Sequence, residues 1–160
     1  MTAASNARFR TFPELPVAQY LRMSTDHQRY SIVNQCRSIR QYADKEGMVV
    51  VRTYADEGKS GLDAVGRDAF MQLIADVQSG LADFRSVLVY DVSRWGRFQN
   101  ADEGAFYEYA CARMGVSVIY CYESFENDGT PFATLIKNIR RSMDCSCRPE
   151  FEPVLRVVPK

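Results

Sequence analysis

The chain has 160 residues, of which 46% are hydrophobic, so it is long enough to bury the core of one ordinary domain. Its 20 Lys and Arg residues balance its 20 Asp and Glu residues, which excludes the strongly basic surface of a stand-alone DNA-binding module. The five cysteines show no paired zinc spacing, which predicts free thiols in a reduced, cytoplasmic protein without a metal site. No apolar run is long enough to span a bilayer, so no membrane contact is predicted.

Predicted elements follow one another in a regular order along the chain. Residues 1–16 show no hydrophobic period and are interpreted as a flexible leader. The alternation of short strands with helices of about 10 to 15 residues indicates an α/β fold. We therefore predict a three-layer sandwich in which helices flank a mostly parallel central sheet. In chain order the expected elements are a strand at 17–23, a helix at 31–46, a strand at 48–55, a helix at 67–79, a strand at 86–91, a helix at 101–114, a strand at 116–121 and a helix at 130–143.

Glycines indicate where three of these helices end. In the first helix, apolar residues recur at a spacing that lines one face, and a glycine follows the last of them. The same arrangement recurs after the second and third helices. The glycines expected to end the helices are Gly47, Gly80 and Gly115.

Polar residues come directly after the predicted strands. In open parallel sheets, ligands gather at the carboxyl ends of the strands, so these positions are candidates for a functional site. Arg22 lies at the end of the first strand and Ser24 directly follows it, and Arg94 and Arg97 follow the third. If the segment after the third strand begins a helical turn, Arg94 and Arg97 share a face and can grip two oxygens of one phosphate.

Ser24 is interpreted either as a nucleophile or as an ordinary turn residue. A serine hydroxyl is a poor nucleophile at its free pKa, so attack on a phosphodiester needs a base, a metal or neutralisation of the phosphate charge by fixed cations. The single histidine, His27, lies in a polar loop and is interpreted as a surface residue. Arginine-driven phosphoryl transfer is the remaining chemistry.

Four short motifs carry a family resemblance, and they are YLRMS (20–24), SIVNQ (31–35), YADEGKSG (54–61) and VSRWGR (92–97). In this order the chain resembles the catalytic domain of serine recombinases, the family of resolvases, invertases, transposon recombinases and large phage-type integrases. The resemblance covers about residues 17–143. It implies a site-specific DNA recombinase that forms a 5′-phosphoserine link to DNA, exchanges strands and religates them without a metal or cofactor. It also implies a homodimer, and a tetramer in the synaptic complex.

The resemblance assigns roles to eight residues. Ser24 matches the family nucleophile, and Arg22, Arg94 and Arg97 match the catalytic arginines. The four residues that match phosphate-binding or site-ordering positions are Arg67, Gln35, Asp56 and Ser60. For Asp56 and Ser60, an ordinary cap or turn is an equal alternative.

The sequence departs from the family pattern at two places. Ser93 stands where many resolvases and invertases have an aspartate, so no general acid is assigned, and Asp91 is the candidate substitute. Residues 144–160 contain three prolines, which are incompatible with the long helix that relatives have there. This segment is interpreted as an irregular tail in place of that helix and of the DNA-binding domain that supplies specificity.

The tail leaves two interpretations of the chain open. In the first, residues 17–143 are a recombinase catalytic domain whose partner is DNA. In the second, the chain is a truncated or frame-shifted remnant that cannot recombine DNA alone and acts only as a folding or oligomerisation module.

Overall fold

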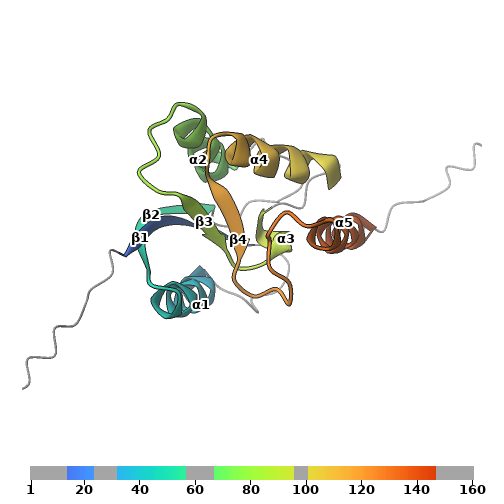
Figure 1. The fold of residues 1–160 in the computed structure, drawn as a ribbon, viewed down its shortest axis with the longest axis horizontal. Coiled ribbons are helices and arrows are strands. Elements are labelled where there is room, and N and C mark those ends of the chain that lie inside the picture. The colour runs from blue at the N-terminus through green and yellow to red at the C-terminus, as the bar shows by residue number, and fades with distance from the viewer. Residues whose placement is uncertain (1–13, 24–31, 57–66, 96–100, 147–160) are drawn as a thin grey trace, which may run out of the picture.

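The computed structural model describes residues 14–23, 32–56, 67–95 and 101–146 (Figure 1). All eight expected elements are present, and a short additional helix, α3, follows the third strand. The elements are β1 (Leu15–Arg22), α1 (Ile32–Lys45), β2 (Met48–Asp56), α2 (Asp68–Gln78), β3 (Ser86–Val89), α3 (Val92–Trp95), α4 (Ala101–Arg113), β4 (Ser117–Tyr120) and α5 (Pro131–Ser146).

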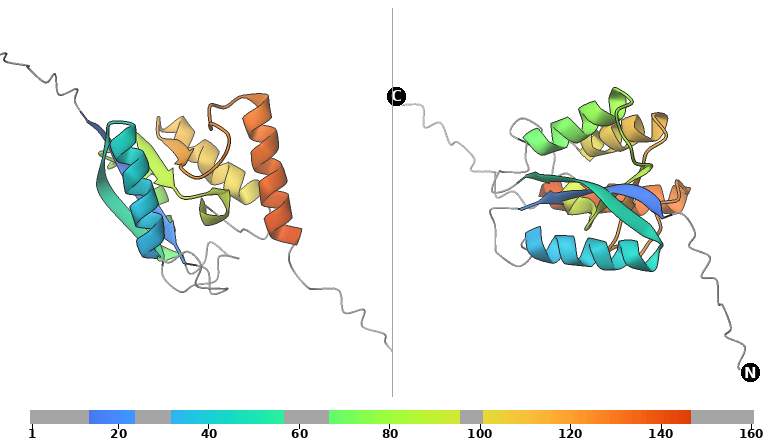
Figure 2. Two further views of the ribbon diagram at one scale, coloured as in Figure 1. Left: turned by 90° about the horizontal axis from the view of Figure 1, so that it is seen from below. Right: turned by 90° about the vertical axis from the view of Figure 1, so that its left-hand side faces the viewer.

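The four strands form one sheet in the order β2-β1-β3-β4, and every pairing is parallel. Helix α1 covers one face of the sheet, and α2 and α4 cover the other face (Figure 2). The predicted three-layer α/β sandwich is therefore confirmed. Parallel strands need long crossover connections, and the helices provide them.

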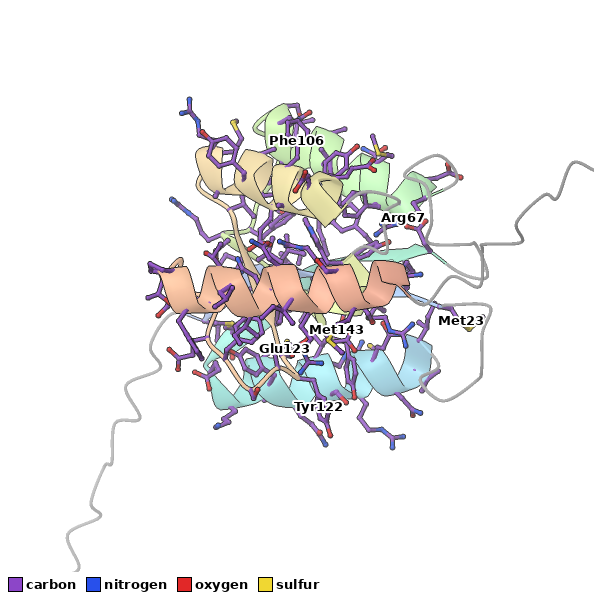
Figure 3. All side chains as sticks on the ribbon, turned by 90° about the vertical axis from the view of Figure 1, so that its right-hand side faces the viewer. Met23, Arg67, Phe106, Tyr122, Glu123 and Met143 are labelled. Carbon is purple, nitrogen blue, oxygen red and sulfur yellow. The ribbon has the colours of Figure 1, made fainter. Side chains whose placement is uncertain are left out.

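Helix α5 lies beside the sheet rather than on one of its faces (Figures 2 and 3). It packs against α3 and α4. Its position matters for function because α3 carries one of the candidate catalytic arginines, Arg94.

The first and last elements are longer than the sequence pattern predicts. Strand β1 starts at Leu15, because Leu15 and Pro16 already pair with Met48 and Val49 of β2. Pro16 is tolerated near the start of a strand, where few ladder hydrogen bonds are lost. Helix α5 continues to Ser146, three residues beyond its expected end. Residues 15 and 16 of the predicted leader thus belong to the sheet, and residues 144–146 of the predicted tail belong to α5.

The predicted helix ends are confirmed at the glycines. Gly47, Gly80 and Gly115 each lie two residues beyond their helix and have φ values of 67°, 74° and 76°. These left-handed conformations suit glycine, which has no Cβ to clash with the backbone.

The larger core fills the space between the sheet and helices α2 and α4. At its centre, the Phe70 ring contacts Trp95, Tyr107 and Tyr20 edge-on, with ring centroids 5.0, 5.2 and 5.4 Å away. Trp95 is fully buried, and its indole N–H donates to the carbonyl oxygen of Gly104 at 3.0 Å. This packing anchors α3 beneath α4. A smaller core, which includes Leu21, Ile39 and Leu88, lies beneath α1.

A buried ionic network joins α4 to α5. The Glu108 carboxylate accepts hydrogen bonds from Lys137 Nζ at 2.5 Å, Asn127 Nδ2 at 2.8 Å, Tyr120 Oη at 3.1 Å and Arg141 Nη2. Burial alone raises the pKa of Glu108, but the hydrogen bonds from Lys137 and Asn127 and the charges of Lys137 and Arg141 outweigh it, so this pKa is lowered. Helix α5 therefore turns two cations toward the protein.

No helix in the described part of the chain is long and apolar enough to cross a membrane.

Candidate active site

The candidate site lies where the carboxyl ends of β1, β2 and β3 meet. The chain passes from β1 to β2 on one side and later returns to β3 on the other, and such a switch point is where parallel sheets bind ligands. Arg22 ends β1 directly opposite Asp56, which ends β2. Figure 3 shows Met23 and Arg67 at this same end of the molecule.

Helix α3 holds Arg22 through its backbone carbonyl groups. The Arg22 side chain is buried, and its Nη2 and Nε donate to the carbonyl oxygens of Ser93 at 2.5 Å and Arg94 at 3.4 Å. In return, Arg94 Nη1 donates to the carbonyl oxygen of Arg22 at 3.4 Å. The two guanidinium groups are therefore placed relative to each other by the contact between β1 and α3.

Gln35 fixes the backbone of Arg22 from the side of α1. Its amide Nε2 donates to the Arg22 carbonyl oxygen at 2.8 Å, and its Oε1 accepts from the Arg22 N–H at 3.3 Å. Gln35 is completely buried. A buried amide with its partners satisfied holds a single geometry, so Gln35 fixes the backbone of Arg22 at the end of β1.

Tyr20 connects Arg67 to Asp56. Its hydroxyl group donates to Asp56 Oδ2 at 2.9 Å and accepts from Arg67 Nη2 at 2.7 Å and Nε at 3.1 Å. Arg67 is completely buried, and its Nη2 also donates to the Trp95 carbonyl oxygen at 2.5 Å. Three consecutive carbonyl groups of α3, at residues 93–95, thus accept from Arg22 and Arg67.

Asp56 also caps helix α2. Its Oδ1 accepts from the backbone N–H of Ala69 at 3.0 Å, and its Oδ2 accepts from that of Phe70 at 3.1 Å. These contacts satisfy backbone donors that the first turn of a helix leaves unpaired. The capping alternative for Asp56 is therefore confirmed, and its role in the site stays a prediction.

The site combines positive charge with a neutral phenol. Burial raises the pKa of Tyr20 above its usual range, and the nearby charge of Arg67 only partly offsets this shift, so the phenol stays protonated and donates to Asp56. Arg22, Arg67 and Arg94 are all buried. Three buried guanidinium groups at one sheet edge suit an anionic ligand such as a phosphodiester.

Asp91 organises the start of α3. Its Oδ1 accepts from Ser93 Oγ at 2.6 Å and from the Arg94 N–H at 3.0 Å. Oδ1 of Asp91, the candidate substitute acid, therefore caps the short helix α3. Within the described ranges, no group of three or more His, Cys, Asp or Glu side chains is placed to hold a metal ion.

The structure brings most of the predicted site residues together. Tyr20 was not predicted as a site residue, although it lies in the YLRMS motif, because a tyrosine in a buried strand has the pattern of a core residue. Ser24, Ser60 and Arg97 lie outside the described residues. The predicted site residues that meet at the sheet edge are Arg22, Gln35, Asp56, Arg67 and Arg94.

This parallel α/β sandwich with its arginine cluster corresponds to a known family. A family model described as "Resolvase, N terminal domain" matches residues 17–146. The chain belongs to this family of serine recombinases, and residues 17–146 correspond to the N-terminal domain of the family. Comparison with curated proteins found no match.

Solved structures of similar proteins agree with this assignment. The N-terminal catalytic domain of TP901-1 integrase is 28% identical with a TM-score of 0.64, and the match covers 81% of this chain and 93% of that one. A resolvase family site-specific recombinase from Streptococcus pneumoniae is 25% identical with a TM-score of 0.65, covering 83% and 89% of the two chains. The catalytic domain of ISC1926 TnpA, an IS607-like serine recombinase, shares the fold at 22% identity, with a TM-score of 0.58 and 78% of each chain covered.

Proposed function

We propose that this chain cleaves and rejoins DNA through Ser24. The Ser24 hydroxyl oxygen attacks the scissile phosphorus, a bond from serine to the 5′ phosphate forms, and the bond to the 3′ oxygen breaks, which releases a 3′ hydroxyl. Attack by the 3′ hydroxyl of another strand reverses these changes and frees the serine. The observation that carries this proposal is the cluster of buried guanidinium groups of Arg22, Arg67 and Arg94. Arg22 lies two residues before Ser24 in the sequence.

Arg22 and Arg94 are assigned to the phosphate. As negative charge develops on the phosphate oxygens, cations that are already held in place stabilise it without reorganisation. Arg97, which the family motif assigns to the same phosphate, completes this group. Arg67, Gln35 and Asp56 order the site, because their contacts run to Tyr20 and to backbone groups. Its motif assigns Ser60 to the same site-ordering group.

Capture of the covalent intermediate tests this function. The chain is joined to the DNA-binding domain of a related recombinase and incubated with a nicked duplex from which the cleaved end diffuses away. We expect a protein–DNA adduct in denaturing gels and a 5′-phosphate on the peptide that contains Ser24. If no adduct forms on any duplex carrying the relative's site, the proposed function is wrong.

Replacing Arg94 by lysine should slow adduct formation by about 10²-fold, by analogy with the loss of a single transition-state donor. Lysine keeps the charge but loses the planar, two-point grip of the guanidinium group. The rate is measured from the time course of the adduct at saturating duplex. Arg113→Lys, at an exposed position in α4, is the matched control and should react at the wild-type rate.

The proposed partners are DNA and a second copy of this chain. Helix α5 exposes an apolar stripe, defined as Phe132, Leu135, Ile139 and Met143, whose exposed fractions are 67%, 56%, 46% and 63%. These residues recur every three or four positions and therefore lie on one side of the helix. Exposed apolar stripes of this kind mark protein interfaces. We assign the stripe to self-association, the first step toward the tetramer that strand exchange requires.

Replacing Ile139 by aspartate should weaken this self-association by at least about tenfold, since it places a charge in an apolar contact that buries it. Sedimentation velocity over a concentration series measures the effect. The matched control is Val33→Asp, which adds the same charge at a 66% exposed apolar residue of α1. Equal dissociation constants for both variants and the wild type would place the interface elsewhere.

A further inference from the structure

Glu123 links the start of α3 to helix α5. Its side chain follows β4 and is only 3% exposed. One carboxylate oxygen, Oε1, accepts from the backbone N–H of Val92 at 3.3 Å. The other, Oε2, forms an ion pair with Arg140 Nη2 at 3.2 Å. Figure 3 shows Glu123 beside α5, on the side that faces α1.

Helix α3 depends on such external contacts because it is very short. It spans only Val92 to Trp95, so the N–H groups of its first turn have few partners within the helix. Asp91 Oδ1 accepts from Arg94, and Glu123 Oε1 accepts from Val92. Two carboxylates of the described residues therefore hold the start of α3, and that of Glu123 also pairs with Arg140 of α5.

The orientation of α3 determines where two catalytic-site guanidinium groups lie. The carbonyl oxygens of Ser93 and Arg94 accept from Arg22, and that of Trp95 accepts from Arg67. A shift of α3 would therefore move both guanidinium groups together. Displacing groups by about 1 Å can slow a reaction by about 10²-fold, even when the mutated residue does not touch the reacting atoms.

Arg140 supplies a positive charge next to the Glu123 carboxylate. A buried carboxylate is costly unless a cation and hydrogen bonds compensate it. The Arg140 side chain is 53% exposed and follows Ile139 of the apolar stripe, whereas the Glu123 side chain is almost fully buried. The ion pair therefore connects the outer part of α5 with the interior contact at Val92.

We propose that Glu123 is a positioning residue through which helix α5 holds α3, and with it Arg22 and Arg67, in the geometry that the phosphate requires. Its catalytic meaning rests on the proposed function, but the positioning itself does not. Among the described residues, Glu123 contacts the backbone N–H of Val92 and the side chain of Arg140, so we infer that it acts on Arg22 and Arg67 through the backbone of α3.

Trp95 provides a direct readout of α3 in the chain itself. It is the only tryptophan in the protein, it belongs to α3, and it is fully buried. In Glu123→Ala we expect a red-shifted Trp95 emission and increased quenching by acrylamide at a temperature where the variant remains folded by circular dichroism. Arg140→Ala should shift the emission in the same direction, and Arg140→Lys should restore it. The matched control is Glu126→Gln, an exposed residue of the same loop, which should match the wild type.

The adduct assay supplies the second readout. Glu123→Ala should lower the rate of adduct formation at saturating duplex by about 10-fold to 10²-fold, while the duplex concentration that gives half the maximal rate changes little. Glu123→Gln keeps an oxygen for the Val92 N–H but loses the ion pair, so its loss should match that of Arg140→Ala. Should Glu123→Ala fail to fold, Glu123→Gln and Arg140→Ala decide whether Glu123 positions α3.

The outcomes separate the two proposals. If the wild type forms no adduct, the proposed function fails, and the Trp95 emission still decides whether Glu123 positions α3. If the wild type forms the adduct and the Glu123 and Arg140 variants match it in both rate and emission, the positioning role is overturned.

Discussion

Replacing Ser24 by alanine should abolish the protein–DNA adduct completely. The adduct is a bond between the serine oxygen and the 5′ phosphate, and alanine has no atom that can form it. Duplex binding should remain close to that of the wild type, since the arginines are unchanged. The measurement is the fraction of labelled duplex retained with protein after denaturation, compared with binding under native conditions.

Ser31 provides the control for this replacement. It is a second serine in the stretch between β1 and α1, so Ser31→Ala removes a hydroxyl from the same part of the chain. We expect Ser31→Ala to form the adduct at the wild-type rate. An adduct that persists in Ser24→Ala, or disappears only in Ser31→Ala, would show that the nucleophile is another residue.

Replacing Glu108 by glutamine should destabilise the fold by about 3 to 5 kcal/mol, the usual cost of breaking a buried ion pair from one side. Glutamine keeps the shape of the side chain but leaves Lys137 and Arg141, which are 8% and 4% exposed, without a compensating negative charge. The free energy of unfolding is measured by urea titration followed by circular dichroism. Glu126→Gln is the control and should change stability by less than about 0.5 kcal/mol.

The effect of Glu108 should depend on pH in a defined direction. The pKa of Glu108 is lowered in the folded state from its ordinary value of 4.5. A lowered folded pKa means that the contribution to stability is complete above the unfolded pKa and is lost as the pH falls through the folded pKa. The wild type and Glu108→Gln should therefore differ most near neutral pH and converge in acid. A constant difference down to pH 2 would contradict this assignment.

Local sequence patterns determined most of the fold. Alternating strand and helix periods predicted every major element, because backbone geometry imposes these periods wherever one face is buried. Gly47, Gly80 and Gly115 predicted three helix ends, since each supplies a left-handed backbone conformation at little cost. The short α3 was foreseen only as a conditional helical turn. With four residues, it is too short to show a hydrophobic period.

Motifs at strand ends also indicated much of the site. Arg22, Asp56 and Arg94 each follow or end a strand in the sequence, and parallel strands bring their carboxyl ends to one edge. Family motifs added Gln35 and Arg67. The structure then shows that Gln35 and Arg67 contact backbone and Tyr20, contacts that a motif cannot specify.

Only the tertiary structure decided which side of α5 faces the protein. The helical period marks Phe132, Leu135, Ile139 and Met143 as one apolar side, which is the side that a helix ordinarily buries. The fold instead buries Lys137 and Arg141, because Glu108 of α4 compensates their charges, and it leaves the apolar stripe exposed.

The links among Tyr20, Asp56 and Arg67 and between Glu123 and α3 were likewise decided by the tertiary structure. Tyr20 and Arg67 are separated by 46 intervening residues, and Val92 and Glu123 by 30, so no local pattern relates them. Such contacts depend on which strands and helices become neighbours. The free energy of a buried hydrogen bond or ion pair is set by the partner that the fold brings to it, and the residue's own position in the sequence does not reveal that partner.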